Sequence, residues 1–147
     1  MANNPWVPFQ GEKVIPLRPR RSVGKRNAQP ERDLVHLPLM NRIRQNVYLS
    51  EHTLHIANER HTTPWYGAIL KAMGVMRYAS DLFIAIPTTR YSGFWIELKA
   101  PGERPNAGQQ QFLDKMRSVG YAADWFDNVD KAWQAIMIYL GSDDLCA

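Results

Sequence analysis

The sequence is poor in cysteine and has no long apolar run. Its 147 residues include a single cysteine, Cys146, so an intramolecular disulfide and a cysteine-based zinc site are both excluded. A lone thiol fits a reducing compartment, and we therefore expect a cytoplasmic protein. No apolar stretch approaches the roughly 20 residues that a membrane helix needs. The N-terminal residues also lack the apolar segment of a secretion signal, so no membrane partner is expected.

The motifs of several enzyme classes are also absent. The sequence has no Gly-x-x-x-x-Gly-Lys phosphate loop, no glycine-rich dinucleotide fingerprint and no Gly-x-Ser-x-Gly nucleophile turn. The histidines form neither a helical His-x-x-x-His pair nor a Cys/His pattern, which argues against a zinc site. They are His36, His52, His55 and His61.

Positive charge is concentrated at the N-terminus. The whole chain has a net charge of +4. Residues 1–30 contain six Lys or Arg against Glu12 alone, a net charge of +5 (6 − 1), so residues 31–147 are net −1 (4 − 5). Five of the ten prolines also lie in residues 1–30, which favours an extended basic arm beside a folded domain at 31–147.

Three roles are open for this arm. Its basic side chains can contact a phosphate backbone. Trp6 and Phe9 can instead dock onto the domain, a neighbouring subunit or a protein partner. The third alternative is a solvated tail. The side chains expected to bind DNA are Arg18, Arg20, Arg21, Lys25 and Arg26.

Apolar spacing predicts a first helix over residues 31–47. Pro38 either interrupts this helix or begins a second one, because proline has no backbone N–H to donate. Its apolar face is expected to contain Leu34, Leu37, Met40 and Ile43.

Turn and capping residues predict the remaining elements, in the order α-β-α-β-β-α-β-α for the whole domain. This order is typical of a compact α/β domain. Trp95 and Trp133 are expected in the core, and so is Trp65, unless it stacks on a base. The elements are a strand at 53–57, a helix from Thr63 to Gly74, strands at 81–87 and 93–99, a helix capped by Asn106 that ends near Gly120, a strand at 121–126 and a helix capped by Asn128.

Residues 81–99 combine two acids and a lysine in adjacent short strands. Glu97 and Lys99 are two residues apart, so their side chains share a face of the strand. A hairpin through residues 88–93 can bring Asp81 alongside them. Two carboxylates and an ammonium suit a divalent metal and a phosphodiester, because Mg²⁺ prefers hard oxygen ligands and a lysine can stabilise developing charge. The alternative is an ordinary hairpin with solvated charges.

Several short segments over about residues 31–140 together form a sequence pattern with a defined order and spacing. They are Asn58-Glu59-Arg60, Gly67-Ala68-Ile69-Leu70-Lys71, Gly74-Val75, Ser80-Asp81-Leu82, residues 93–99, Gln109-x-x-Phe112-Leu113, Gly120-Tyr121 and Tyr139-Leu140. This pattern resembles the VRR-NUC type of PD-(D/E)XK nuclease, which is found in phages and in replication-repair nucleases. The resemblance implies a restriction-endonuclease-like α/β core, with a central mixed sheet flanked by helices.

The resemblance also implies roles for individual residues. Asp81 and Glu97 would be metal ligands, with the backbone carbonyl of Leu98 as a third. Lys99 would be the catalytic lysine. Gln109 matches the family's helix glutamine, which faces the active site, although an amide here can instead cap a local carbonyl. The implied cofactor is Mg²⁺ or Mn²⁺, because both accept oxygen ligands.

The family also has an acid on its first helix, for which Glu31 is the first candidate, as a further residue of the metal site, and Asp33 the second. Glu59 is a further candidate for the pocket, with a solvated loop position as the alternative. The sequence departs from the family pattern just before the metal aspartate. Tyr78 replaces a small residue there and Ser80 replaces a proline.

Two functions from different classes fit the sequence. The resemblance implies a metal-dependent DNA endonuclease that is structure-specific for junction, flap or branched DNA in phage replication, recombination or repair. Such an enzyme is expected to be a homodimer, in the host cytoplasm if phage-encoded. The alternative is a catalytically silent nuclease fold that binds DNA or protein, or serves as a virion structural module docked through its arm. A sequence-specific homing or restriction nuclease is a weaker third option, since no recognition domain is evident.

Overall fold

The computed structural model describes residues 29–57 and 63–141. Within these ranges the strands form one mixed sheet in the order β1-β2-β3-β4. The β1–β2 and β2–β3 pairs are antiparallel, whereas β3 and β4 are parallel. The strands are β1 (Thr53–His55), β2 (Leu82–Ile84), β3 (Phe94–Leu98) and β4 (Ala122–Phe126).

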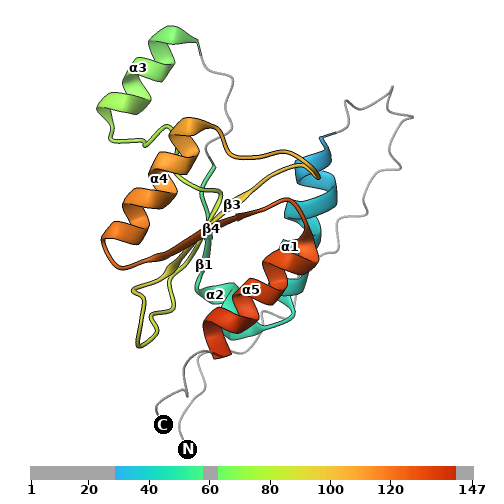
Figure 1. The fold of residues 1–147 in the computed structure, drawn as a ribbon. Coiled ribbons are helices and arrows are strands. Elements are labelled where there is room, and N and C mark those ends of the chain that lie inside the picture. The colour runs from blue at the N-terminus through green and yellow to red at the C-terminus, as the bar shows by residue number, and fades with distance from the viewer. Residues whose placement is uncertain (1–28, 58–62, 142–147) are drawn as a thin grey trace, which may run out of the picture.

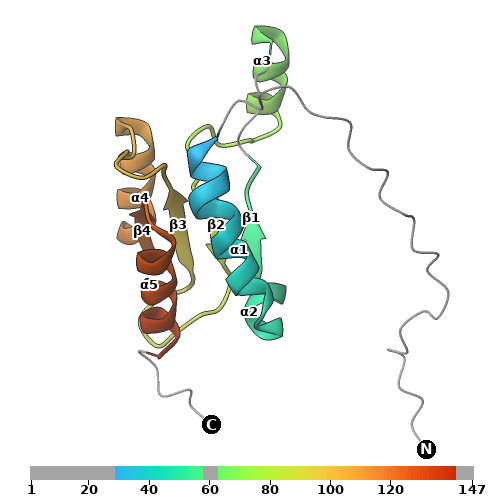
Figure 2. The same cartoon turned by 90° about the vertical axis from the view of Figure 1, so that its right-hand side faces the viewer.

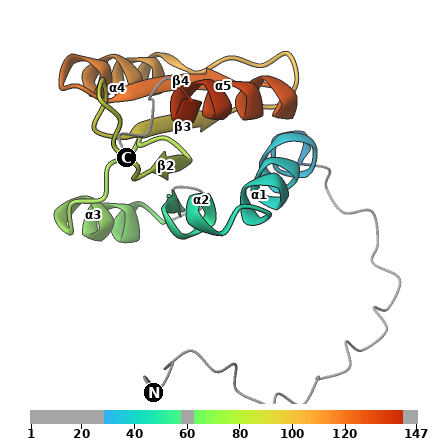
Figure 3. The same cartoon turned by 90° about the horizontal axis from the view of Figure 1, so that it is seen from below.

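Helices cover both faces of this sheet. In Figures 1 and 3, α1 and α5 lie on one side of the strands and α4 lies on the other. The helix α4 also makes the crossover that two parallel strands require. Within the described residues, no helix is long and apolar enough to cross a membrane. The helices are η1 (Glu31–His36), α1 (Leu37–Arg44), α2 (Val47–Glu51), α3 (Pro64–Ala72), α4 (Ala107–Ser118) and α5 (Val129–Gly141).

The main core lies between the sheet and the layer formed by η1, α1 and α5. Even-numbered side chains of β2 and β3 face this layer, because successive strand side chains alternate between faces. Tyr139 joins the core to the loop after β2, and its hydroxyl donates a hydrogen bond of 2.5 Å to the carbonyl of Ile86. The buried residues of this core are Val35, Leu39, Ile43, Leu49, Leu82, Ile84, Ile86, Phe94, Ile96, Leu98, Ala132, Ile136 and Tyr139.

A smaller aromatic cluster fills the space between the sheet and α4. The Phe83 and Trp95 rings are stacked with their centroids 4.4 Å apart. Phe112 of α4 meets Trp95 edge-on at 5.2 Å. These strand residues are odd-numbered, and so are Asp81 and Glu97. Both candidate acids therefore belong to the face that α4 covers.

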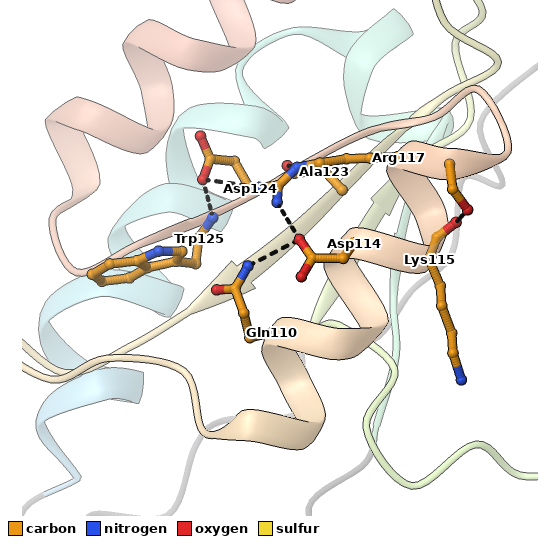
Figure 4. A network of polar contacts seen from close by, with 8 residues as sticks. Gln110, Asp114, Lys115, Arg117, Ala123, Asp124 and Trp125 are labelled. Carbon is orange, nitrogen blue, oxygen red and sulfur yellow. Dashed lines mark hydrogen bonds and ion pairs between the residues drawn. The ribbon is translucent and has the colours of Figure 1, made fainter.

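Polar contacts fix α4 against β4 (Figure 4). The Arg117 side chain donates from Nε to the Ala123 carbonyl at 2.7 Å and from Nη1 to Asp114 at 2.9 Å. Its Nη2 also lies 3.6 Å from the Asp124 carboxylate. Arg117 thus joins two carboxylates and one backbone carbonyl across the two elements. Because α4 carries Gln109, this network helps to hold the helix that approaches the candidate site.

The first predicted helix is divided near Pro38, one of the two expected outcomes, and its predicted apolar face is confirmed only in its second half, where Ile43 is buried and Met40 packs against the core. Leu34 is 58% exposed and Leu37 is 46% exposed, whereas Val35 and Leu39 are buried. The reason lies at Pro38, which has no N–H for the Leu34 carbonyl and would clash with it in an α-helix. The chain forms a wider π turn instead, with the Leu37 N–H donating to Arg32. This turn shifts the buried face by one residue.

The other predicted boundaries are confirmed within a few residues. The Thr63 hydroxyl accepts from the Tyr66 N–H at 3.3 Å and caps α3. The Asn128 side chain accepts from the Asp130 N–H at 2.8 Å at the start of α5. Gly74, which follows α3, has φ +86°, a conformation that favours glycine.

The helix α3 departs most from the expected packing. No residue of α3 is buried, and Trp65 is 74% exposed, so the prediction that Trp65 lies in the core is wrong. Trp133 does pack against the main core, and Trp95 belongs to the aromatic cluster. Figures 1 and 2 show α3 beyond one end of the sheet, apart from the layers of the domain.

Candidate functional site

The candidate site lies where β2 begins and β3 ends. Leu82 pairs with Ile96 in the antiparallel register. Extending that register by one residue places Asp81 opposite Glu97. The two acids, which lie on strands joined by the hairpin, therefore meet at one end of the sheet, as the sequence predicted.

Glu97 is the centre of this cluster. Its side chain is 1% exposed, which is unusual for a carboxylate. Its Oε1 lies 2.8 Å from Lys99 Nζ and also accepts a hydrogen bond from Gln109 Nε2. Its Oε2 is buried and has no hydrogen-bond partner. A buried charged oxygen without a partner is costly, and such groups are typical of functional sites.

Asp81 is anchored against the end of β3. Its Oδ2 accepts a hydrogen bond of 2.7 Å from the backbone N–H of Leu98. Its backbone carbonyl accepts one of 2.7 Å from the Ile56 N–H. Asp81, immediately before β2, is thus hydrogen-bonded to β3 on one side and to the end of β1 on the other. The Leu98 carbonyl stays a predicted ligand, since the contact seen here uses the Leu98 amide.

Gln109 caps its own helix and also contacts the candidate site. Its side-chain Oε1 accepts from the Asn106 backbone N–H at 3.0 Å, and its backbone N–H donates to Asn106 Oδ1 at 3.0 Å. These two bonds form a capping box at the start of α4. The remaining group, Nε2, donates to Glu97. The cap therefore orients the amide that contacts the candidate site.

Glu31 at the start of η1 completes the cluster. Its Oε2 lies 3.9 Å from Lys99 Nζ, so the first-helix acid favoured by the sequence does reach the site. Asp33, the second candidate, pairs instead with Arg32 at 2.8 Å, where both side chains are about half exposed. Glu59 lies outside the described residues.

Burial and neighbouring charges shift the pKa values of the central pair. Burial, followed by the charge of Asp81, raises the pKa of Glu97 from 4.5 to about 7, although Lys99 opposes the shift. Burial lowers the pKa of Lys99, but the hydrogen bond and charge of Glu97, with the charges of Glu31 and Asp81, outweigh it and leave the pKa raised. Lys99 is therefore an ammonium at neutral pH, so it acts as a charge and hydrogen-bond donor rather than as a base.

Comparison with known proteins identifies the fold. No protein-family model matches the sequence, and no curated protein matches it. A solved structure described as a "VRR_NUC domain protein" is similar, with a TM-score of 0.67 and 24% sequence identity; the match covers 79% of this chain and 92% of that chain. The chain has the VRR-NUC fold. The expected α/β core, a central mixed sheet flanked by helices, is confirmed.

Nucleases with the VRR-NUC fold generally use divalent metals, and the residues present fit such an ion. Carboxylates are the hard oxygen ligands that Mg²⁺ and Mn²⁺ accept, and Glu97 Oε2 is a buried oxygen without a partner. Within residues 29–57 and 63–141, no three His, Cys, Asp or Glu side chains converge closely enough to form a metal site. An ion held by Asp81 and Glu97 would thus need waters or a backbone carbonyl as well, as is usual for Mg²⁺.

The two departures from the VRR-NUC sequence pattern lie beside this site. Ser80 is fully buried, and its Oγ has no hydrogen-bond partner. The Tyr78 ring packs on the first turn of α4, where a Cβ added to Gly108 would lie 2.7 Å from the ring. Sequence reasoning missed Gly108. A glycine next to Gln109 in a first helical turn was the available signal, because glycine is unfavourable there unless something packs closely.

The basic residues expected to bind DNA all precede residue 29 and lie outside the described residues. The division between an arm at 1–30 and a domain at 31–147 likewise stays a prediction.

Proposed function

We propose that this chain is a metal-dependent DNA endonuclease that hydrolyses phosphodiester bonds. The observation that carries the proposal is the buried Glu97 carboxylate. One of its oxygens is held by Lys99 and Gln109, the other has no hydrogen-bond partner, and the charge of Asp81 acts on the group. A purely structural role gives no reason to bury this group, because an apolar residue of similar size would be cheaper to bury. The VRR-NUC fold supports the same conclusion.

Each residue of the cluster has a distinct proposed part in hydrolysis. Asp81 and Glu97 would hold a Mg²⁺ or Mn²⁺ ion, with the Leu98 carbonyl as a third ligand. The bound ion would polarise a phosphoryl oxygen and lower the pKa of an attacking water. Lys99 keeps its proton and would stabilise the negative charge that develops on the phosphoryl group.

Two further residues position this set. Gln109 keeps Glu97 oriented through a hydrogen bond that its own helix cap aligns. The Glu31 carboxylate lies 3.9 Å from Lys99 Nζ and adds negative charge to the cluster. Hydrogen-bond partners of metal ligands commonly set ligand orientation in this way.

The substrate and assembly belong to the same proposal. We expect a structure-specific enzyme that acts on junction, flap or branched DNA in phage replication, recombination or repair. We also expect a homodimer, because two sites related by a two-fold axis can cut two strands symmetrically. The basic arm, through Arg18, Arg20, Arg21, Lys25 and Arg26, would supply phosphate contacts.

Cleavage of a panel of labelled DNAs tests this function. The panel contains duplex, single strand, flap, fork and four-way junction, each incubated with Mg²⁺, Mn²⁺ or EDTA. The expected result is metal-dependent cleavage of a branched form by the parent protein and not by Glu97→Ala or Lys99→Ala. If the folded parent cuts nothing in either metal, the chain is instead a binding or structural module with a nuclease fold.

A further inference from the structure

The apolar surface of α3 has no place in the catalytic cluster. Trp65, Ile69 and Met73 are spaced four residues apart, so they share one side of α3 and its C-terminal cap. Trp65 is 74% exposed, Met73 is 73% exposed and Met76 in the following loop is 55% exposed. We call these four residues the α3 surface. Single exposed apolar residues are ordinary, but three large ones, Trp65, Met73 and Met76, exposed on one short segment are typical of a surface that contacts a partner.

The charge of this region indicates what kind of partner it fits. Residues 63–80 contain Lys71 and Arg77 and no aspartate or glutamate. In a two-fold contact between copies of the chain, the same patch faces itself, so these positive charges would oppose one another. A polyanion would meet them with opposite charge. An exposed tryptophan in a segment whose charged side chains are all basic suits single-stranded nucleic acid, because every base has a face on which an aromatic ring can stack.

The α3 surface is joined to the candidate site by a short segment that contacts α4 through Tyr78 and is buried at Ser80. Tyr78 follows Met76 by two residues and packs on Gly108, next to Gln109. Ser80 is fully buried and precedes Asp81 directly. A strand lying on α3 would therefore be close to the end of the sheet where Asp81 and Glu97 meet, at the top of the view in Figure 1.

From these observations, we infer that the α3 surface stacks on unpaired bases of a DNA strand beside the candidate cleavage site, with Trp65 as the main stacking residue. This inference rests on the proposed nuclease function and extends it. It means that the preferred substrate carries unpaired nucleotides next to the scissile bond, as flaps, forks and opened junctions do. A fully paired duplex keeps its bases stacked on one another and has none to offer to Trp65.

Binding of labelled oligonucleotides in EDTA tests the inference without requiring cleavage. The full chain is titrated with a fluorescein-labelled oligothymidylate and with a blunt duplex of equal length. Trp65→Ala is expected to weaken oligothymidylate binding about tenfold or more and to affect the duplex less. Trp65→Phe should retain most of the affinity, because it keeps an aromatic ring. Tyr48→Ala is the matched control, since Tyr48 is an exposed ring on α2 (58%) and should leave binding unchanged.

Two results would overturn the inference. One is equal oligothymidylate binding by the parent and Trp65→Ala. The other is a change from dimer to monomer in Trp65→Ala with unchanged oligothymidylate affinity, which would assign the α3 surface to a second copy. The proposed nuclease function can fail separately. If the parent cuts no DNA but loses oligothymidylate affinity on Trp65→Ala, the stacking surface stands and the endonuclease does not.

Discussion

The Glu97 cluster (Glu31, Asp81, Glu97, Lys99 and Gln109) and the α3 surface both depart from the usual distribution of polar and apolar groups. The cluster buries charged groups, and the α3 surface exposes apolar ones. In the first, a carboxylate and an ammonium are buried at the end of a sheet. In the second, a tryptophan of α3 and two methionines that follow this helix are exposed, and no residue of α3 is buried. Each arrangement is unfavourable for folding alone. Both occur at the same end of the domain, joined by residues 77–81, which indicates that this end is shaped by what it binds.

The largest expected effect comes from removing the buried ammonium. Lys99→Met should lower single-turnover cleavage by about 100- to 1000-fold, because the charge that stabilises the transition state is lost. Lys115→Met, on the exposed side of α4, is the matched control and should cleave normally. Quench-flow or gel assays on the preferred DNA measure both. Equal rates for the two variants would remove Lys99 from the mechanism.

Removing a side chain should lower the free energy of unfolding far more in the core than on the α3 surface. Ile136 is fully buried in the main core, so Ile136→Ala should lower the free energy of unfolding by about 2–5 kcal/mol. Trp65→Ala removes a larger side chain but should change it by no more than about 0.5 kcal/mol, since Trp65 lies mostly in solvent. Urea unfolding of both variants measures the difference. A comparable loss in Trp65→Ala would show that α3 is packed in solution.

The pKa of Glu97 predicts how stability depends on pH in the absence of metal. Its folded value, about 7, lies above its ordinary value of 4.5, so the folded state holds the proton more tightly. The stabilisation is complete below about pH 4.5 and is lost as pH rises through about 7. The difference of 2.5 pKa units corresponds to about 3 kcal/mol.

Urea unfolding in EDTA from pH 4.5 to pH 8 tests this dependence. Glu97→Gln cannot ionise at this position, so the parent should lose stability relative to Glu97→Gln across the window. Parallel pH profiles for the two proteins would show that Glu97 is not buried with a raised pKa.

Substitution of Gln109 should lower cleavage by a smaller factor, and the right substitution separates its role as a helix cap from its contact with Glu97. Gln109→Glu keeps the capping box, because glutamate is as suitable as glutamine at this position. It replaces the amide donor with a second carboxylate beside Glu97, so cleavage should fall about 10- to 100-fold while the helix stays intact. Gln111→Glu, two residues further on the exposed side, is the control. Unchanged cleavage with unchanged circular dichroism would make Gln109 a cap and nothing more.

Much of the fold could be predicted from the sequence because its boundaries depend on local chemistry. Thr63, Asn106 and Asn128 cap their helices through side-chain hydrogen bonds to residues two or three positions ahead. The pairing of Asp81 with the end of β3 also followed, since a hairpin fixes register over a short distance. Such features need only a few neighbouring residues.

What the sequence did not predict depends on tertiary packing or on atoms far apart. The shift of the buried face in the first helix came from a π turn at Pro38, which spacing rules for an α-helix do not contain. The exposure of Trp65 was missed because an apolar stripe in a sequence does not say what covers it. The dual use of the Gln109 amide could have been suspected from the Asn106-x-x-Gln109 capping pattern, but its contact with Glu97 needed the relative placement of α4 and β3.

Comparing Glu97→Gln with Glu51→Gln tests the central claim most directly. Both variants change one carboxylate to an amide of nearly equal size, but Glu51 is exposed at the end of α2. Each protein is assayed for nicking of closed-circular and branched DNA in Mg²⁺ and Mn²⁺, and for unfolding in EDTA at pH 8. The account predicts that Glu97→Gln loses cleavage by about 1000-fold while being at least as stable as the parent, and that Glu51→Gln behaves like the parent. Full cleavage by Glu97→Gln would contradict it.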